Sequence, residues 1–199
     1  KFWPADLHVV GKDILRFHAV YWPALLMAAD LPLPKRLFAH GWWTKDGQKI
    51  SKSIGNVIDP NDLVERYGVD ATRFFLMAEV NFGNDGDFSD INMIFKVNAN
   101  LANELGNLCQ RTLSLVYKNC QQSVPSCGEL AESDEVLLDN AKGLLERATA
   151  AIEVQAIQKY VEILVTMIVD TNKYIDEQAP WVLRKENPER MNTVLYVIM

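Results

Sequence analysis

Leu7-His8-Val9-Val10-Gly11-Lys12-Asp13 opens a part of the chain in which two short apolar runs flank a helical pattern. Leu7 to Val10 predict a buried strand that Gly11 ends, and Asp13 can cap the helix that follows. The predicted helix carries apolar and aromatic residues at helical spacing: Ile14, Phe17, His18, Tyr21, Trp22, Leu25 and Leu26. Residues 36–44 predict a second strand. Strand, crossover helix and strand make one parallel βαβ unit, so we expect an α/β fold here.

Turn and cap residues organise the next segment. Asp46-Gly47 predicts a tight turn after the second strand. Asp59-Pro60 predicts a helix start, with the aspartate as cap and proline in the first position. Gly68 should end that helix, and Asp70 should cap another that reaches about residue 79.

From residue 89 onward the pattern is almost wholly helical. We expect one long helix over 90–118, a loop over 120–132, and two further helices over 134–153 and 154–178. Pro180 should end the last of these, and Pro188 should start another. Helices joined by short loops favour an all-α antiparallel bundle.

Composition excludes several classes of protein. The chain has 199 residues, a formal net charge of −6 and 49% hydrophobic residues, which are globular proportions. The net charge argues against indiscriminate nucleic-acid binding but allows a local basic patch. Three widely spaced cysteines give neither a disulfide framework nor a metal knuckle. We expect no membrane span, because no apolar run approaches the ~20 residues that one requires.

Lys49-Ile50-Ser51-Lys52-Ser53 is the sharpest chemical signal. It places two ammonium groups three residues apart among small hydroxyl residues, with Gly47 and Gly55 on either side. Lysines offer point charges to phosphate oxygens, and hydroxyls and backbone N–H groups add hydrogen bonds. Taken alone, the run fits a solvated lysine loop equally well. Its position after a βαβ unit favours a polyphosphate site.

This run resembles the K-M-S-K-S loop of class I aminoacyl-tRNA synthetases, with Ile50 where methionine is commoner. Other stretches resemble the methionyl-tRNA synthetase family, and they cover essentially the whole chain. They are Gly11-Lys12-Asp13-Ile14, Phe17-His18, Trp22-Pro23, His40-Gly41 and Asn172-Lys173-Tyr174-Ile175-Asp176-Glu177-Gln178-Ala179-Pro180-Trp181. The run from Phe82 to Ser89 resembles the bacterial and organellar branch.

The resemblance implies a fold and a reaction. Residues 1–85 would be the C-terminal part of a Rossmann-like catalytic domain with the lysine loop and stem-contact helices. Residues 86–199 would be a helical anticodon-binding domain, truncated at its end. Methionine and ATP, with Mg²⁺ in the substrate complex, would give methionyl-adenylate, and the methionyl group would pass to tRNA(Met). Lys52 would stabilise the pyrophosphate in the transition state, with Lys49 assisting. The implied ATP contacts are His40, Gly41, Lys49, Ser51, Lys52 and Ser53.

Two more sites follow from the resemblance. The methionine pocket would comprise Asp13, Phe17, His18 and Trp22, because aromatic rings suit a thioether and Asp13 would receive the ammonium group. Without the resemblance, the aromatic residues fit core positions and Asp13 a plain cap. Asn107, Arg111 and Trp181 would meet the CAU anticodon, with the indole stacking on a base. A core tryptophan is the alternative for Trp181. Asn103 fits a solvated face on the same helix row.

Some expected parts are missing from these residues. The H-I-G-H motif does not occur, and in the family it lies upstream, as does an insertion that often carries structural zinc. The chain ends at Val197-Ile198-Met199 inside an apolar pattern, so we expect a piece of a longer protein that alone cannot make adenylate. We expect a bacterial cytoplasmic or organellar location and no metal site here. A leucine, isoleucine, valine or cysteine synthetase and a non-catalytic tRNA-binding module remain alternatives. A P-loop hydrolase is excluded, because G-x-x-x-x-G-K-[ST] is absent.

Overall fold

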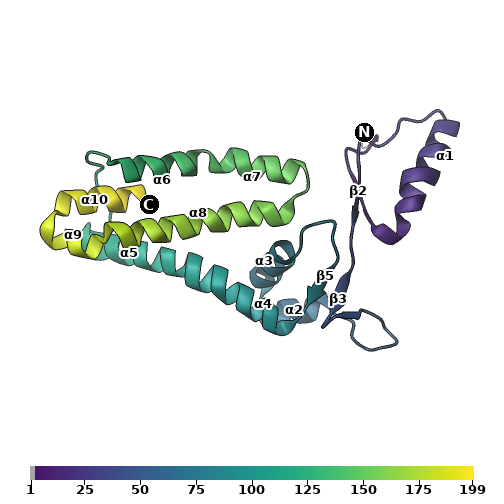
Figure 1. Cartoon of the computed structure of the whole chain (residues 1–199), viewed down its shortest axis with the longest axis horizontal. Coiled ribbons are helices and arrows are strands. Elements are labelled where there is room, and N and C mark those ends of the chain that lie inside the picture. The colour runs from purple at the N-terminus through teal and green to yellow at the C-terminus, as the bar shows by residue number, and fades with distance from the viewer. Residues whose placement is uncertain (1–2) are drawn as a thin grey trace. The chain divides into compact units, whose positions relative to one another are not determined.

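The computed structural model describes residues 3–199 and divides them into two compact units. One unit ends at Asn92 and contains the strands, and the other begins at Met93 and is helical (Figure 1). No helix within residues 3–199 is both long and apolar enough to cross a membrane.

The first unit begins with the βαβ element that the sequence predicts. Strand β1 (His8–Gly11) pairs in parallel with β2 (Leu37–His40), with His8 opposite Leu37 and Gly11 opposite His40. The crossover has three consecutive helical segments: η1 (Lys12–Ile14), η2 (Phe17–Tyr21) and α1 (Trp22–Ala28). The predicted cap at Asp13 is wrong. Gly11 leads directly from the strand into the helix, so Asp13 already lies inside the first turn.

The strand predicted over 36–44 is two strands in different sheets. Strand β2 ends before Gly41 and Trp42, which belong to no strand. Strand β3 (Trp43–Lys45) then lies between β4 (Gln48–Lys49) and β5 (Gly86–Phe88) in a second sheet. A Cβ atom on Gly41 would stand 2.2 Å from the Asn84 carbonyl oxygen. The Trp42 N–H donates to the Asp85 carboxylate at 2.8 Å. Backbone from residues 84–85 therefore interrupts the strand.

Turn and cap predictions in the rest of this unit are confirmed with one exception. Asp46 and Gly47 have φ of 50° and 75°, as a two-residue hairpin turn requires. Helix α2 (Pro60–Tyr67) starts where Asp59 accepts from the Asn61 N–H at 2.8 Å. Helix α3 (Val69–Glu79) follows Gly68 directly. Asp70 therefore lies in its first turn and does not cap it, contrary to prediction.

The long helix expected over 90–118 is confirmed. It comprises α4 (Asp90–Val97), the π-helical segment η3 (Asn98–Gly106) and α5 (Asn107–Asn119), which follow one another without a break. The predicted helix over 134–153 is divided at Gly143 into α6 (Glu132–Lys142) and α7 (Leu144–Glu153). Helix α8 (Ile157–Gln178) starts later than predicted, because Gln155 has a φ of 57°.

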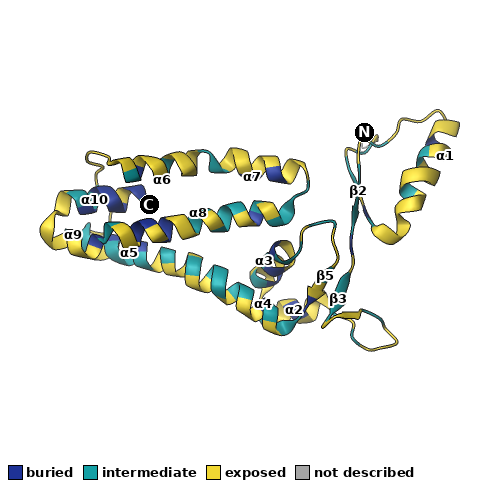
Figure 2. Cartoon of the chain, viewed as in Figure 1, coloured by how far each residue is buried: buried dark blue, intermediate teal, exposed yellow. Residues whose placement is uncertain are grey.

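The helical unit is the expected antiparallel bundle. Helices α6 and α7 run antiparallel to α8, which also packs against α5, and α9 (Pro180–Glu186) and α10 (Pro188–Val197) close one end (Figure 1). Buried positions gather on α10 and on the second half of α8 (Figure 2). One core cluster comprises Leu137, Tyr174, Val194 and Val197, and another comprises Val116, Met191 and Leu195.

Candidate functional site

An aromatic hollow of about 470 Å³ lies beside β1 in the first unit. It brings together three of the four residues expected to contact methionine: Phe17, His18 and Trp22. All three come from the crossover, in which Phe17–Tyr21 has the wider π-helical turn. Insertions of π-helix are frequent at functional sites. The other lining residues are Trp3, His8, Tyr21 and Leu25.

Ring contacts shape one wall of this hollow. Trp3 meets Trp22 edge to face with centroids 6.1 Å apart, and His8 meets His18 in the same way at 6.5 Å. The His18 Nδ1 atom lies 3.0 Å from the Ile14 carbonyl oxygen, which can only accept. Nδ1 therefore carries the proton, and Nε2 of a neutral imidazole is left as an acceptor. The hollow thus combines polarisable ring faces with the polar atoms of His8, His18 and Tyr21.

Four lining residues were not predicted to belong to the pocket: Trp3, His8, Tyr21 and Leu25. Trp3 is placed by its indole N–H, which donates to the Pro32 carbonyl oxygen at 3.0 Å. Its separation of 29 residues from that partner leaves no local signal. His8 stands on β1, and its buried Nδ1 atom has no hydrogen-bond partner within the described part of the chain. The alternation of side chains along the strand could have indicated which face of the strand His8 occupies, but not that a hollow lies there.

Asp13 is not among the residues that line the hollow. Its carboxylate folds back over Gly11, where an added Cβ atom would meet Asp13 Oδ1 at 2.5 Å. The same point lies 3.9 Å from Cε1 of His40, which is opposite Gly11 on the neighbouring strand. The structure therefore places Asp13 with His40 at the carboxyl ends of two parallel strands. Ligands bind at this edge in open α/β sheets.

The lysine loop leaves the β3–β4 hairpin in a compact turn. The Ser51 carbonyl oxygen accepts from the N–H groups of Ile54 and Gly55 at 3.2 and 3.1 Å. The Ser51 and Ser53 hydroxyl oxygens are 2.8 Å apart, and the Lys52 side chain is exposed. The two hydroxyl groups therefore shape the loop, and both lysine heads stay accessible to solvent and to an anion.

Asn56 holds this loop and was missed by the sequence analysis. Its Oδ1 atom accepts from the Ser51 N–H at 2.8 Å, and its Nδ2 atom donates to the Lys49 carbonyl oxygen at 3.1 Å. One side-chain amide therefore supplies both a donor and an acceptor to the loop backbone. The nearby Gly55 could have indicated a turn, but not which side chain closes it.

Two aspartates fix the base of the hairpin. Asp87 accepts from the Thr44 hydroxyl and from the Gly47 N–H, the latter at 2.8 Å, and these hydrogen bonds hold its pKa below the usual value. Asp85 accepts from the Lys12 ammonium at 2.6 Å, and that hydrogen bond likewise lowers its pKa. Neither aspartate was predicted from the sequence to have a role in the hairpin.

The helical unit brings two of the three expected anticodon residues together. The Arg111 guanidinium lies 5.6 Å from the centroid of the Trp181 ring and forms an ion pair with Asp176. Trp181 is 45% exposed, so its ring is not a core residue. Asn107 is exposed one helical turn before Arg111, on the same side of α5. The structure thus presents an exposed indole, a guanidinium and an amide.

The π-helical segment η3 precedes Asn107 and is bound from α8. Asn172 donates to the Glu104 carbonyl oxygen at 3.1 Å and to its carboxylate at 3.0 Å. A π-helical turn leaves carbonyl groups out of the usual i→i+4 pattern, and a side-chain amide from another helix can satisfy one of them. This contact fixes α8 against the start of α5.

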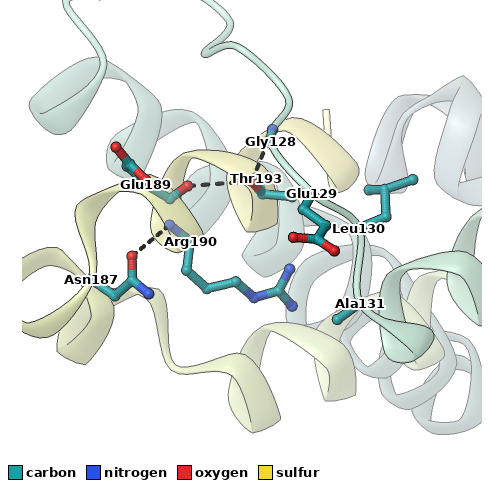
Figure 3. Close-up of a pocket in the computed structure, with 8 residues that line it drawn as sticks. All are labelled: Gly128, Glu129, Leu130, Ala131, Asn187, Glu189, Arg190 and Thr193. Atoms are coloured by element: carbon teal, nitrogen blue, oxygen red, sulfur yellow. Dashed lines mark hydrogen bonds between the residues drawn. The ribbon is translucent and has the colours of Figure 1, made fainter.

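A second hollow, of about 460 Å³, lies in the helical unit between the segment Gly128–Ala131 and α10 (Figure 3). The Gly128 N–H donates to the Thr193 hydroxyl at 3.0 Å, and that hydroxyl donates to the Glu189 carbonyl oxygen at 3.3 Å. The Arg190 guanidinium is paired with Asp134. The hydrogen bonds through Thr193 therefore anchor the segment Gly128–Ala131 to α10. Within residues 3–199, no three His, Cys, Asp or Glu side chains form a metal-binding group.

Family models match both units. Residues 1–113 match "tRNA synthetases class I (M)", and residues 124–198 match "Anticodon binding domain of methionyl tRNA ligase". The methionine–tRNA ligase of Brucella suis is 54% identical over 196 residues, which are 98% of this chain and 38% of that protein. The methionine–tRNA ligase of Rickettsia felis is 52% identical over 202 residues, 100% of this chain and 40% of that protein.

Solved structures show the same likeness in three dimensions. Mycobacterium tuberculosis methionyl-tRNA synthetase in complex with methionyl-adenylate superposes with a TM-score of 0.94 at 52% identity. The match covers 99% of this chain and 40% of that one. The chain therefore spans about two fifths of the length of the relatives it matches.

Proposed function

The chain belongs to the methionine branch of the class I tRNA synthetases, and we propose that the protein of which it forms part attaches methionine to tRNA(Met). The reaction would pass through a methionyl-adenylate made from ATP. One observation carries the proposal: the lysine loop leaves a hairpin in the same unit as an aromatic hollow of about 470 Å³. A cationic loop suits the triphosphate, and the hollow suits the thioether.

In the first reaction, the methionine carboxylate attacks the α-phosphate and pyrophosphate leaves. Negative charge grows on the leaving group, so fixed cations aimed there stabilise the transition state more than the ground state. We assign this role to Lys52, with Lys49 assisting. Ser51, Ser53, His40 and Gly41 complete the ATP contacts. Mg²⁺ would arrive bound to the phosphates, since the described residues offer no cluster of acidic ligands.

Recognition of methionine is assigned to the aromatic hollow. Phe17 and Trp22 offer ring faces to the sulfur, and such contacts are favourable by about 0.3–1.5 kcal/mol each. His18 presents Nε2 as an acceptor. Asp13 is assigned to the substrate ammonium, a role supported by its position at the end of β1 beside His40. Trp3 joins the wall of the hollow.

Recognition of tRNA is assigned to the helical unit. Asn107 and Arg111 would hydrogen-bond to the edges of unstacked CAU bases, and Trp181 would stack on one of them. We assign residues 1–85 to the end of the catalytic domain and residues 86–199 to the anticodon-binding domain. Structural zinc would belong to parts of the protein outside these residues. The bacterial relatives favour a bacterial cytoplasmic or organellar location.

ATP–pyrophosphate exchange on the full-length protein tests the proposal. Methionine, leucine, isoleucine, valine and cysteine would be compared, beside Lys52→Ala and, as a control, Lys142→Ala. Lys142 is 75% exposed and pairs with neighbouring Asp139 on α6. We expect exchange with methionine alone, a loss of more than about tenfold in the Lys52 variant, and no change in the control.

The other outcomes separate the alternatives. Exchange with another amino acid would keep the class and remove methionine as the substrate. Absence of exchange with all five would favour a non-catalytic tRNA-binding module. We expect the 199-residue chain alone to show no exchange, because it lacks the H-I-G-H motif.

A further inference from the structure

Trp42 stands where the chain leaves β2 and enters the hairpin of the lysine loop. Its side chain is 44% exposed. The Lys12 ammonium lies 4.5 Å from the centroid of its ring, and the Lys49 ammonium lies 5.3 Å away. Both distances fall within the roughly 6 Å over which an aromatic face attracts a cation. One indole therefore meets two cations, and one of them belongs to the lysine loop.

Asp85 makes this arrangement possible. Its carboxylate forms an ion pair with Lys12 at 2.6 Å and accepts from the Trp42 backbone N–H at 2.8 Å. The first contact offsets the positive charge of Lys12, so the two ammonium groups repel each other less. The second fixes the backbone that carries the ring. Asp85 thus holds both Lys12 and Trp42 in place, and Lys49 lies near the same ring.

Lys49 has no carboxylate partner among residues 3–199, so the Trp42 ring is the described contact of its ammonium group. Lys52, three residues on, has neither a ring contact nor an ion pair in the same part of the chain. The two lysines of the loop therefore differ: one is held and the other is free to move. A flexible lysine stem allows such a contact to be exchanged for another.

We propose that Trp42 is a positioning residue whose ring holds Lys49, and that the phosphates of ATP compete with the ring for this ammonium. The inference rests on the proposed function, since it names the triphosphate as the competitor. A phosphate oxygen carries charge and the ring does not, so ATP wins the competition. The ring contact weakens ATP binding by the strength of one exposed cation–π pair, about two- to fivefold.

Equilibrium binding of ATP to the full-length protein, without methionine, tests this. The variants are Trp42→Leu, Trp42→Phe, Lys49→Met, Lys52→Met, and Trp42→Leu combined with each lysine change. We expect Trp42→Leu to tighten ATP binding about two- to fivefold and Trp42→Phe to lie between it and the wild type. In the Lys49→Met background the Trp42→Leu effect should vanish. In the Lys52→Met background it should persist, because Lys52 does not contact the ring.

Three results would overturn the proposal: weaker ATP binding in Trp42→Leu, equal effects in the two lysine backgrounds, or an unchanged affinity. A general loss of structure in Trp42→Leu would change ATP affinity equally in the Lys49→Met and Lys52→Met backgrounds. The comparison of the two double variants therefore separates such a loss from a positioning role. Methionine-dependent pyrophosphate exchange by the wild type is measured in parallel. If the wild type catalyses exchange and Trp42→Leu leaves ATP affinity unchanged, the role of Trp42 is refuted and the proposed function stands. If exchange is absent, the proposed function fails first.

Discussion

Replacement of Arg190 by methionine should destabilise the helical unit and weaken one component of its pH dependence. Asp134 is fully buried, and Arg190 Nη2 donates to its Oδ1 atom at 2.8 Å while Nη1 donates to Oδ2. The Tyr174 hydroxyl and the Ala131 N–H also donate to this carboxylate. The network joins α6, α8 and α10. Removal of Arg190 leaves the buried carboxylate of Asp134 without its positively charged partner.

The structure gives the size and sign of the effect. Burial raises the pKa of Asp134, but the hydrogen bonds from Arg190, Tyr174 and Ala131 outweigh it and lower the pKa from 3.8 to about 2. A lowered pKa contributes about 2 kcal/mol of stability above pH 3.8, which is lost as the pH falls through about 2. Loss of one partner of a buried pair destabilises by about 3–5 kcal/mol.

The variant should lose less stability than the wild type as the pH falls. Without Arg190, the pKa of Asp134 should rise from about 2, because burial still raises it and the hydrogen bonds and positive charge of Arg190 no longer lower it. This carboxylate then contributes less stability at neutral pH, and less of that stability is lost toward acidic pH. The gap in unfolding free energy between wild type and variant should therefore be about 3–5 kcal/mol at pH 7. This difference between wild type and variant should be smaller at pH 3 than at pH 7 by about 1 kcal/mol or more.

Urea unfolding followed by far-ultraviolet circular dichroism at both pH values measures this gap. Arg184→Met is the matched control, because Arg184 is exposed on α9, and it should change the unfolding free energy by less than about 0.5 kcal/mol at either pH. A gap that stays constant or widens toward pH 3 would refute the buried ion pair as its origin.

Three further predictions concern the two candidate sites and the strand break. Trp181→Leu in the full-length protein should weaken tRNA(Met) binding by about 1–3 kcal/mol in a filter-binding assay, and an unchanged affinity would argue against base stacking. Asn56→Ala should lower pyrophosphate exchange several-fold without changing the KM for methionine, because Lys49 and the loop lose two hydrogen bonds; Asn56→Asp, which keeps the acceptor, should lose less. Gly41→Ala should lower the melting temperature, since its Cβ atom would stand 2.2 Å from the Asn84 carbonyl oxygen, and an unchanged melting curve would contradict that packing.

Features set by neighbouring residues were predictable from the sequence. The parallel βαβ unit, the Asp46-Gly47 turn, the cap at Asp59 and the helix start at Pro188 all appear as expected. Each depends on backbone preferences that act over a few residues. The lysine loop was recognisable for the same reason, since its chemistry is carried by five consecutive residues.

Tertiary contacts alone decided which side chains meet. Four features join residues that are far apart in the chain: the break at Gly41, the place of Trp3 in the aromatic hollow, the ion pair of Asp176 with Arg111, and the contact of Lys12 with Trp42. Such contacts depend on how whole elements pack, and a periodic pattern records only that a face is buried, not what covers it. Local patterns therefore predicted most of the helices and turns and the chemistry of the lysine loop. The folded structure determined the partners that position them.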